Sequence, residues 1–361
     1  MNVFLIIRGI VGNGLNCIRM SGVARDERVV WLDYLRVLTI YLVVVGHTSV
    51  CEDFNVFIYY FHMPFFFLCS GLMFNVEKEG GFTDFFKKKA LSLLVPFVTF
   101  HLISYPFWLF FDRNYGADAC LAYAWYEPLS DIFLGRFAID NAPLWFLTAL
   151  FATEIIYYVI AKNVDSKRLI FVLPFLIVIG YLSQKFISFE LPFMLQTVAV
   201  ALIFYSIGNI FKTQIFQLGE KKILWHLISF VICGVFLYFA SKYNGKVAMH
   251  INQYGNFWLF LLFSVVALLF AQSLSVLIAY ACQRRNWVEY ISRNLIVIVG
   301  LHMMVGKFIK LITIYVFNLP LAIYQDTIFP NLIFSLASIL LLVPVMIFVN
   351  RYCPKVIGKF R

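Results

Sequence analysis

Long apolar runs recur along the chain between residues 33 and 349. A run of about 18 or more apolar residues is long enough to cross the hydrocarbon core of a bilayer as a helix. The pattern predicts ten such spans, at residues 33–50, 56–76, 91–111, 142–161, 168–184, 191–211, 223–240, 257–279, 291–313 and 329–349. We therefore expect an all-α integral membrane protein, a polytopic bundle of about ten transmembrane helices.

Composition agrees with this fold class. Of the 361 residues, 62% are hydrophobic and only 13% are charged, whereas soluble chains hold about 25% charged residues. The net charge of +10 could suggest a nucleic-acid partner, but the basic residues follow the predicted topology. With the N-terminus in the cytoplasm, twenty-one Lys and Arg residues outside the spans or at their ends are cytoplasmic and five are external. This positive-inside bias predicts that both termini are cytoplasmic, and the charge then orients the protein in the bilayer without nucleic acid.

The chain divides simply. Residues 1–28 are expected to form an N-terminal cytoplasmic tail that is dispensable if translation starts at Met20. Residues 29–350 form the membrane domain, and residues 351–361 form a basic cytoplasmic C-terminal tail. The seven cysteines show no metal-ligand spacing, so no metal site is predicted.

Three ionisable residues, Asp33, Arg36 and His47, interrupt the first apolar run. Arg36 and His47 are eleven residues apart, or about 1100° of helix, so their directions differ by about 20° and His47 lies about 16 Å deeper. Charged groups that face lipid are costly, so this face should point into the bundle or into a watery cavity. One interpretation is an interfacial Asp33–Arg36 ion pair with a structural histidine. The other is a polar channel for a ligand that runs from the cytosol to mid-membrane.

Five short motifs carry a family resemblance. They are WLDYLRVLTIYLVVVGH (31–47), FHMPFFFLCSGLMF (61–74), KKKALSLLVPF (87–97), PLWFLTALF (143–151) and ISRNLIVIVGLH (291–302). In this order they resemble the integral-membrane acyltransferase 3 family, and the fourth is similar to its fucose 4-O-acetylase-like subgroup. The resemblance covers most of the chain.

The resemblance implies transfer of an acetyl group from cytosolic acetyl-CoA to a hydroxyl of a bacterial surface polysaccharide, such as O-antigen, or of its lipid-linked precursor. Acetyl-CoA would be a co-substrate with no bound cofactor, and the bacterial cytoplasmic (inner) membrane would be the location. It also implies that His47 is the essential catalytic residue and that Arg36 is its essential companion. Two features depart from the family pattern: Lys87, Lys88 and Lys89 replace an Arg-x-Arg, and Glu154 lies nine residues after Trp145 rather than five.

The chemistry of acyl transfer suits these residue types. A hydroxyl that attacks a thioester needs a base, and histidine titrates in the useful range. Arg36, Ser292 or Asn294 could stabilise the oxyanion. The cluster Lys87, Lys88 and Lys89 could bind the phosphates of coenzyme A, or could be only a topology signal. The supporting candidates are Asp33, His62, Trp145, Ser292, Asn294 and His302.

Each supporting candidate also has a structural interpretation. His62 and His302 could be core histidines with satisfied hydrogen bonds, and Trp145 could be an interfacial anchor. The alternative function is a polytopic transporter or flippase of lipid-linked sugars, since a polar stripe in a helical bundle also serves transport. The chain shows no internal repeat of the kind found in many transporters, which argues against that alternative.

The charge distribution gives a testable topology. Reporter fusions after residues 78–88 and 162–168 should read as cytoplasmic, and fusions within 115–135 as external, because the basic residues concentrate beside the former positions. Paired phosphatase and fluorescent-protein reporters distinguish the two sides. A reversed pattern would overturn the span assignment.

Overall fold

The computed structural model describes residues 29–115, 123–136 and 141–360. The predicted N-terminal tail, residues 1–28, lies outside the described residues. Across the described ranges the secondary structure is helical, apart from one isolated bridge between Ala248 and Gln253. The predicted all-α class is therefore confirmed.

Nine helical segments of the described chain are long and apolar enough to cross a membrane. They are Glu52–Met73, Phe82–Asp112, Ala142–Asn163, Leu169–Phe186, Pro192–Ile210, Ile223–Ala240, Phe257–Cys282, Leu295–Tyr315 and Phe329–Tyr352. The remaining predicted span corresponds to α2 (Val30–Gly46), which has 17 residues and ends four residues earlier than expected. The polytopic membrane bundle is thus confirmed, and its orientation stays a prediction.

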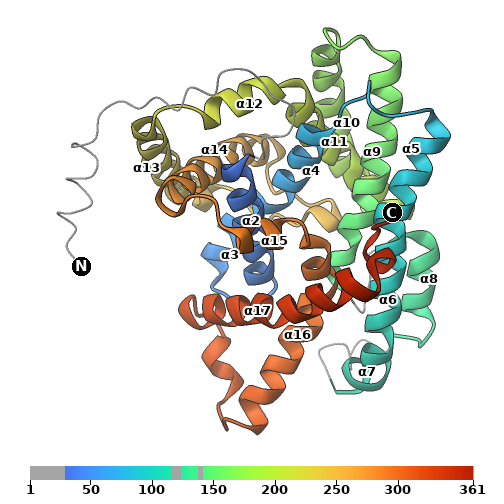
Figure 1. Cartoon of the computed structure of the whole chain (residues 1–361), viewed down its shortest axis with the longest axis vertical. Coiled ribbons are helices and arrows are strands. Elements are labelled where there is room, and N and C mark those ends of the chain that lie inside the picture. The colour runs from blue at the N-terminus through green and yellow to red at the C-terminus, as the bar shows by residue number, and fades with distance from the viewer. Residues whose placement is uncertain (1–28, 116–122, 137–140, 361) are drawn as a thin grey trace.

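The helices that build the interior are α3 (Glu52–Tyr59), α4 (His62–Met73), α5 (Phe82–Lys89), α6 (Val95–Phe107), α9 (Trp145–Asn163), α11 (Leu195–Ile210), α14 (Phe257–Cys282), α15 (Asn286–Ser292), α16 (Leu295–Tyr315) and α17 (Phe329–Tyr352). The helix α2 packs against α3, α4, α14, α15, α16 and α17, and Figure 1 shows it near the middle of the bundle. Helices α10 (Val172–Phe186) and α13 (Ile223–Ala240) are mostly exposed and present apolar surface. The polar residues of α2 are therefore enclosed by protein.

The second predicted span is broken into α3 and α4. Non-helical backbone at membrane depth is tolerated only where its polar groups are satisfied within the protein. Pro64 has no N–H for the carbonyl of Tyr60, and the hydroxyl of Ser264 donates to that oxygen at 2.6 Å. The Nδ1 of His62 donates to the carbonyl of Ile58 at 2.8 Å. These two side-chain bonds stabilise the break.

Glycines allow α4 and α11 to pack at very short range. A Cβ added to Gly71 would lie 2.0 Å from the carbonyl oxygen of Tyr205, and one added to Gly208 would lie 2.1 Å from the oxygen of Leu68. The Nδ2 of Asn209 adds bonds of 3.2 Å to Gly71 O and 3.0 Å to Phe74 O. Small residues with interhelical hydrogen bonds are a usual means of association in membranes.

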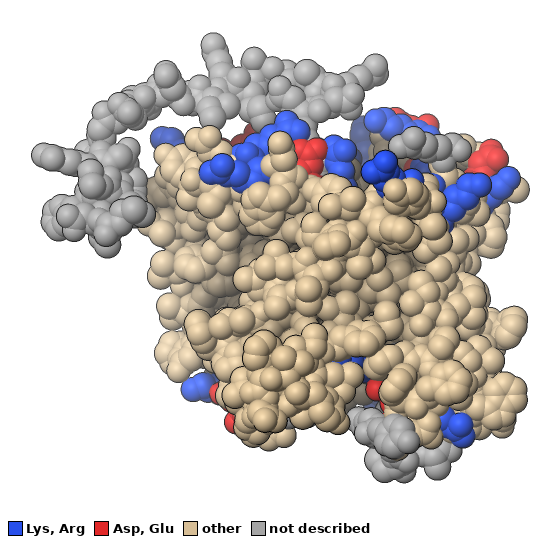
Figure 2. Space-filling model, turned by 60° about the horizontal axis from the view of Figure 1, so that its bottom comes forward, with Lys and Arg blue, Asp and Glu red and all other residues tan. Residues whose placement is uncertain are grey.

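Charge is distributed unevenly over the surface. Lys and Arg residues gather at one end of the molecule, next to a broad belt without charged residues (Figure 2). The belt agrees with the many exposed apolar side chains on the outer helices. The segregation fits a protein that sits in a bilayer with its basic end in one aqueous phase.

The close contact between α4 and α11 predicts a sensitive position. Gly71→Ala should destabilise the protein by about 1–3 kcal/mol, because the new methyl group overlaps rigid backbone rather than a movable side chain. Gly81→Ala is the control, since an added Cβ there meets only Asp84 Oδ2 at 4.0 Å. Thermal unfolding in detergent measures both variants. Equal melting temperatures would contradict the packing described.

Candidate functional site

An outer cavity of about 190 Å³ lies at the end of α2. Its polar lining is made of His47, Tyr59, His62, Trp145 and His250. His47 directly follows the last residue of α2, where its N–H bonds to the carbonyl of Val44 at 3.2 Å. The end of the helix therefore places the imidazole at the wall of a cavity rather than against lipid.

His302 lies beside His47. The centroids of the two rings are 5.3 Å apart. The Nδ1 of His302 is 2.6 Å from the carbonyl oxygen of Ile298, so this nitrogen carries the proton. The Nε2 of the same ring is buried and has no hydrogen-bond partner within the described part of the chain. A ring nitrogen available for a hydrogen bond thus stands next to the candidate catalytic histidine, in the manner of a group that orients a base.

An inner cavity of about 320 Å³ lies on the side predicted to face the cytoplasm. Arg36 lines it together with Cys69, Ser70, Glu79, Lys89, Glu154, Tyr205 and Ser292. The Nε of Arg36 donates to Cys69 Sγ at 3.1 Å. The hydroxyl of Ser292 donates to Asp33 Oδ1 at 2.7 Å. Asp33 and Ser292 therefore form one buried link between α2 and α15 beside Arg36.

Three apolar side chains, Phe66, Phe146 and Val299, line both cavities. The rings of Phe66 and Phe146 have centroids 5.7 Å apart and are tilted by 54°. Arg36 and His47 consequently line different cavities. The interpretation of the polar face of α2 as one channel is therefore replaced by two cavities that share these three side chains, contributed by α4, α9 and α16.

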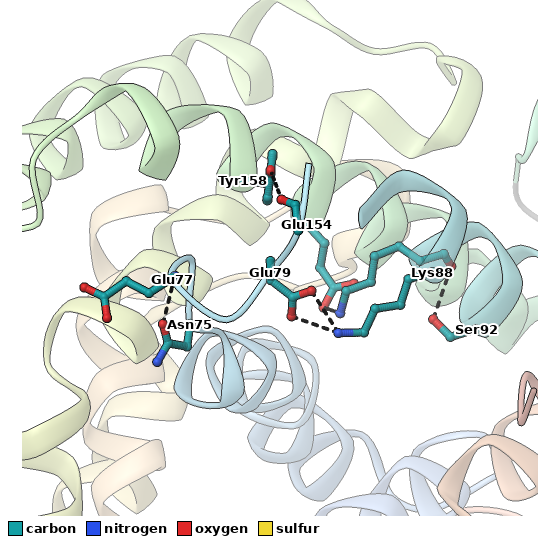
Figure 3. Close-up of polar contacts among 9 residues, drawn as sticks. Asn75, Glu77, Glu79, Lys88, Ser92, Glu154 and Tyr158 are labelled. Atoms are coloured by element: carbon teal, nitrogen blue, oxygen red, sulfur yellow. Dashed lines mark hydrogen bonds and ion pairs between the residues drawn. The ribbon is translucent and has the colours of Figure 1, made fainter. Parts of the chain in front are cut away.

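The three consecutive lysines do not form one cluster. The Nζ of Lys89 bonds to Glu154 Oε1 at 2.8 Å inside the inner cavity, and both side chains are largely buried. Lys88 is exposed and pairs with Glu79 at 2.8 Å, and Figure 3 shows the Glu154 carboxylate next to this pair. Lys87 is exposed. Successive helical side chains point about 100° apart, which explains the divergence.

Glu154 is a site residue that the motif comparison did not identify. Its spacing from Trp145 departs from the family pattern, yet it lines the inner cavity. Its Oε2 is buried and has no hydrogen-bond partner among the described residues. The available signal was a carboxylate inside an apolar span, which by itself indicates a functional position.

His250 is a second residue that the motifs did not identify, and it lies in the polar segment between α13 and α14. The centroids of the His250 and Trp145 rings are 6.2 Å apart. Burial, assisted by the nearby charge of Lys246, lowers the pKa of His250 to about 4. The imidazole is therefore neutral at ordinary pH. Nothing in the periodicity of a loop indicates such a position.

Asn294 and His101 lie apart from both cavities. The Oδ1 of Asn294 accepts from Asn350 Nδ2 at 2.7 Å and from Lys359 Nζ at 2.9 Å. This network connects the start of α16 to α17 and to the C-terminal segment, residues 351–361, which the sequence analysis predicts only as a basic tail. The His101 ring packs on Phe97, with centroids 5.1 Å apart.

The histidines of the outer cavity are not arranged as metal ligands. Over the described ranges, no three His, Cys, Asp or Glu side chains are grouped so that they could hold a metal ion. The outer cavity is instead a set of neutral hydrogen-bonding rings beside His47.

These features agree with the comparisons to known proteins. The family model Acyl_transf_3, described as an acyltransferase domain, matches residues 29–351. The chain therefore belongs to this family and is a membrane acyltransferase. No curated protein and no solved structure gives a significant match. Family membership favours acyl transfer over the transporter interpretation.

The buried Lys89–Glu154 pair predicts a stability effect. Lys89→Met should destabilise the protein by about 3–5 kcal/mol, because it leaves an uncompensated buried carboxylate. Adding Glu154→Gln should restore much of the loss, since the remaining group is neutral. Thermal unfolding measures the single and the double variant. Lys87→Met is the control, because Lys87 is exposed and its replacement should leave the melting temperature unchanged. If Lys89→Met leaves the melting temperature unchanged, the ion pair with Glu154 is not formed.

Proposed function

We propose that the protein is an O-acetyltransferase that moves an acetyl group from cytosolic acetyl-CoA to a sugar hydroxyl of a bacterial surface polysaccharide or its lipid-linked precursor. The observation that carries the proposal is the pair of cavities that meet at Phe66, Phe146 and Val299. One cavity contains a guanidinium and an ion pair, and the other contains neutral histidines. Two substrates of different chemistry can thus approach one point from two sides.

The inner cavity suits the donor. Its polar residues Arg36, Lys89 and Glu154 can bond to the amides and the thioester of a pantetheine arm. The phosphates of acetyl-CoA are too strongly hydrated for this depth. Lys88 is exposed and pairs with Glu79, which lines the cavity, so Lys88 can meet phosphate as a point charge, as can the exposed Lys87. Arg36 lies on α2, the helix that ends next to His47, and its guanidinium can stabilise the oxyanion of the transition state.

The outer cavity suits the acceptor. In the proposed reaction His47 removes the proton from the acceptor hydroxyl while its oxygen attacks the thioester carbonyl. The new C–O bond forms, the C–S bond breaks, and the thiolate of coenzyme A leaves and takes up the proton. His302 lies beside His47 with its Nε2 unprotonated, so it can accept an N–H of His47 and favour the productive ring orientation.

A variant of this scheme has two transfers. The imidazole of His47 attacks the thioester first, coenzyme A leaves, and the acceptor hydroxyl then displaces the histidine from the acetyl group. The partition between the cavities is compatible with both schemes, because His47 lies on the acceptor side in each. Detection of an acetylated protein when donor is supplied without acceptor separates them.

His47→Ala is expected to abolish acetylation of the acceptor, since neither scheme works without this imidazole. Thr48→Ala is the matched control, because its hydroxyl bonds only locally, to the carbonyl of Val45 at 2.7 Å. The measurement is mass spectrometry of envelope glycans from cells with equal membrane levels of each variant, together with thiol release from acetyl-CoA. Full acetylation by the His47 variant would exclude the mechanism.

A further inference from the structure

A third cavity, the vestibule, lies next to the outer cavity. It has a volume of about 480 Å³ and its polar lining is Ser49, Glu52, Asn55, Lys246 and Asp326. Tyr59 and His250 line both the vestibule and the outer cavity, so they form the neck between the two. The way from the vestibule to His47 therefore passes these two rings.

The chemistry of the vestibule fits a polyhydroxylated ligand. The carboxylates of Glu52 and Asp326 accept hydrogen bonds, Lys246 donates, and the Asn55 amide does both. With two negative groups and one positive group, the lining repels the phosphates of coenzyme A and favours neutral hydroxyls. The Oδ1 of Asn55 is buried and, among the residues that the structure describes, has no hydrogen-bond partner.

The walls of the vestibule are held in place by specific bonds. The backbone of the His250 segment is fixed by Thr197, whose hydroxyl donates to the carbonyl of Met249 at 2.6 Å. Asp326 adopts a left-handed backbone with φ of 52°, and its N–H bonds to the carbonyl of Ser49 at 2.9 Å. Aspartate tolerates this region better than most residues other than glycine, so the turn and its bond to Ser49 hold this side of the wall. The polar groups are thus preorganised rather than spread on a loose surface.

We propose that the vestibule binds a sugar unit of the acceptor glycan, and that Tyr59 and His250 at its neck present the hydroxyl to be acylated to His47. Glu52, Asn55 and Asp326 contact the hydroxyls of that sugar. His250 acts as a positioning residue. Its neutral imidazole has one nitrogen that donates and one that accepts, so it can hold the incoming hydroxyl by a hydrogen bond without taking its proton. This inference rests on the proposed function and adds the place where the acceptor sugar binds and the residues that contact it.

The first test uses the full-length protein in lipid nanodiscs, acetyl-CoA, and a panel of methyl hexosides and methyl 6-deoxyhexosides as acceptor probes. Glu52→Gln combined with Asn55→Ala should raise the KM for the best glycoside about tenfold or more, a change of about 1.4 kcal/mol per factor of ten. The KM for acetyl-CoA should not change. Asp53→Asn is the matched control, because this neighbouring carboxylate is exposed and does not line the vestibule. An unchanged glycoside KM in the double variant, or a raised KM for acetyl-CoA, would overturn the assignment.

A second measurement separates this inference from the proposed function. Thermal stabilisation of the protein by the same glycosides reports binding without any reaction. Stabilisation of the wild type and of Asp53→Asn, lost in the Glu52 and Asn55 double variant, supports the vestibule even if no acetyl transfer is observed. Transfer to a glycoside that stabilises all variants equally would leave the function standing and refute the vestibule.

The neck is tested by paired substitutions. His250→Ala should raise the KM for the glycoside, and His250→Gln should restore part of the loss because the amide also accepts and donates hydrogen bonds. A purely structural histidine would give the opposite profile, with a lower melting temperature in both variants and an unchanged glycoside KM. That result would remove His250 from the acceptor path.

Discussion

The cost of placing ionisable groups at membrane depth determines the arrangement of this protein. Asp33 and Arg36 lie on a helix that would otherwise be apolar, and lipid contact would penalise both. Six helices pack around α2, and two of them supply Ser292 as a partner for Asp33 and Cys69 as a partner for Arg36. The polar residues are then available to small cavities rather than to the bilayer. The position of α2 at the centre follows from this constraint.

Two kinds of side chain shape the space around α2. Gly71 and Gly208 let the backbones of α4 and α11 approach closely, which fixes the wall that carries Tyr205. Phe66 and Phe146 occupy the space between the cavities. Close packing on one side of α4 and the aromatic pair on the other leave the outer and the inner cavity on either side of Phe66 and Phe146. The cavities thus result from the packing of α4, not from a gap in the bundle.

The sequence predicts the spans well, because a continuous apolar run has few alternatives to a membrane helix. It also predicts that Asp33, Arg36 and His47 avoid lipid. It does not predict the break between α3 and α4, which depends on Ser264, a residue about two hundred positions away that satisfies Tyr60. Glu154 and Lys89 are likewise 65 positions apart. Contacts of this range carry no local periodicity and require the fold itself.

His250 illustrates the same limit at the candidate site. Its segment shows only a polar loop in the sequence, and its position against Trp145 results from bonds to α11, such as that of Thr197 with Met249. Conversely, Asn294 sits in a family motif, yet its amide oxygen accepts from Asn350 and Lys359 and lies apart from the cavities. A motif identifies which residues recur, whereas the bonds they form decide whether they hold the fold or line a site.

The aromatic partition also bears on how acyl transfer could avoid hydrolysis. A thioester exposed to water from both sides would lose its acyl group to water, and enzymes suppress such side reactions by closing the reacting centre. Phe66, Phe146 and Val299 offer no hydrogen bond to water and separate the guanidinium of Arg36 from the imidazole of His47. In the proposed reaction the thioester carbonyl passes these three apolar side chains only when an acceptor hydroxyl occupies the outer cavity. Phe66, Phe146 and Val299 would then favour acyl transfer over hydrolysis, and this role would be as important as that of His47 in the transfer itself.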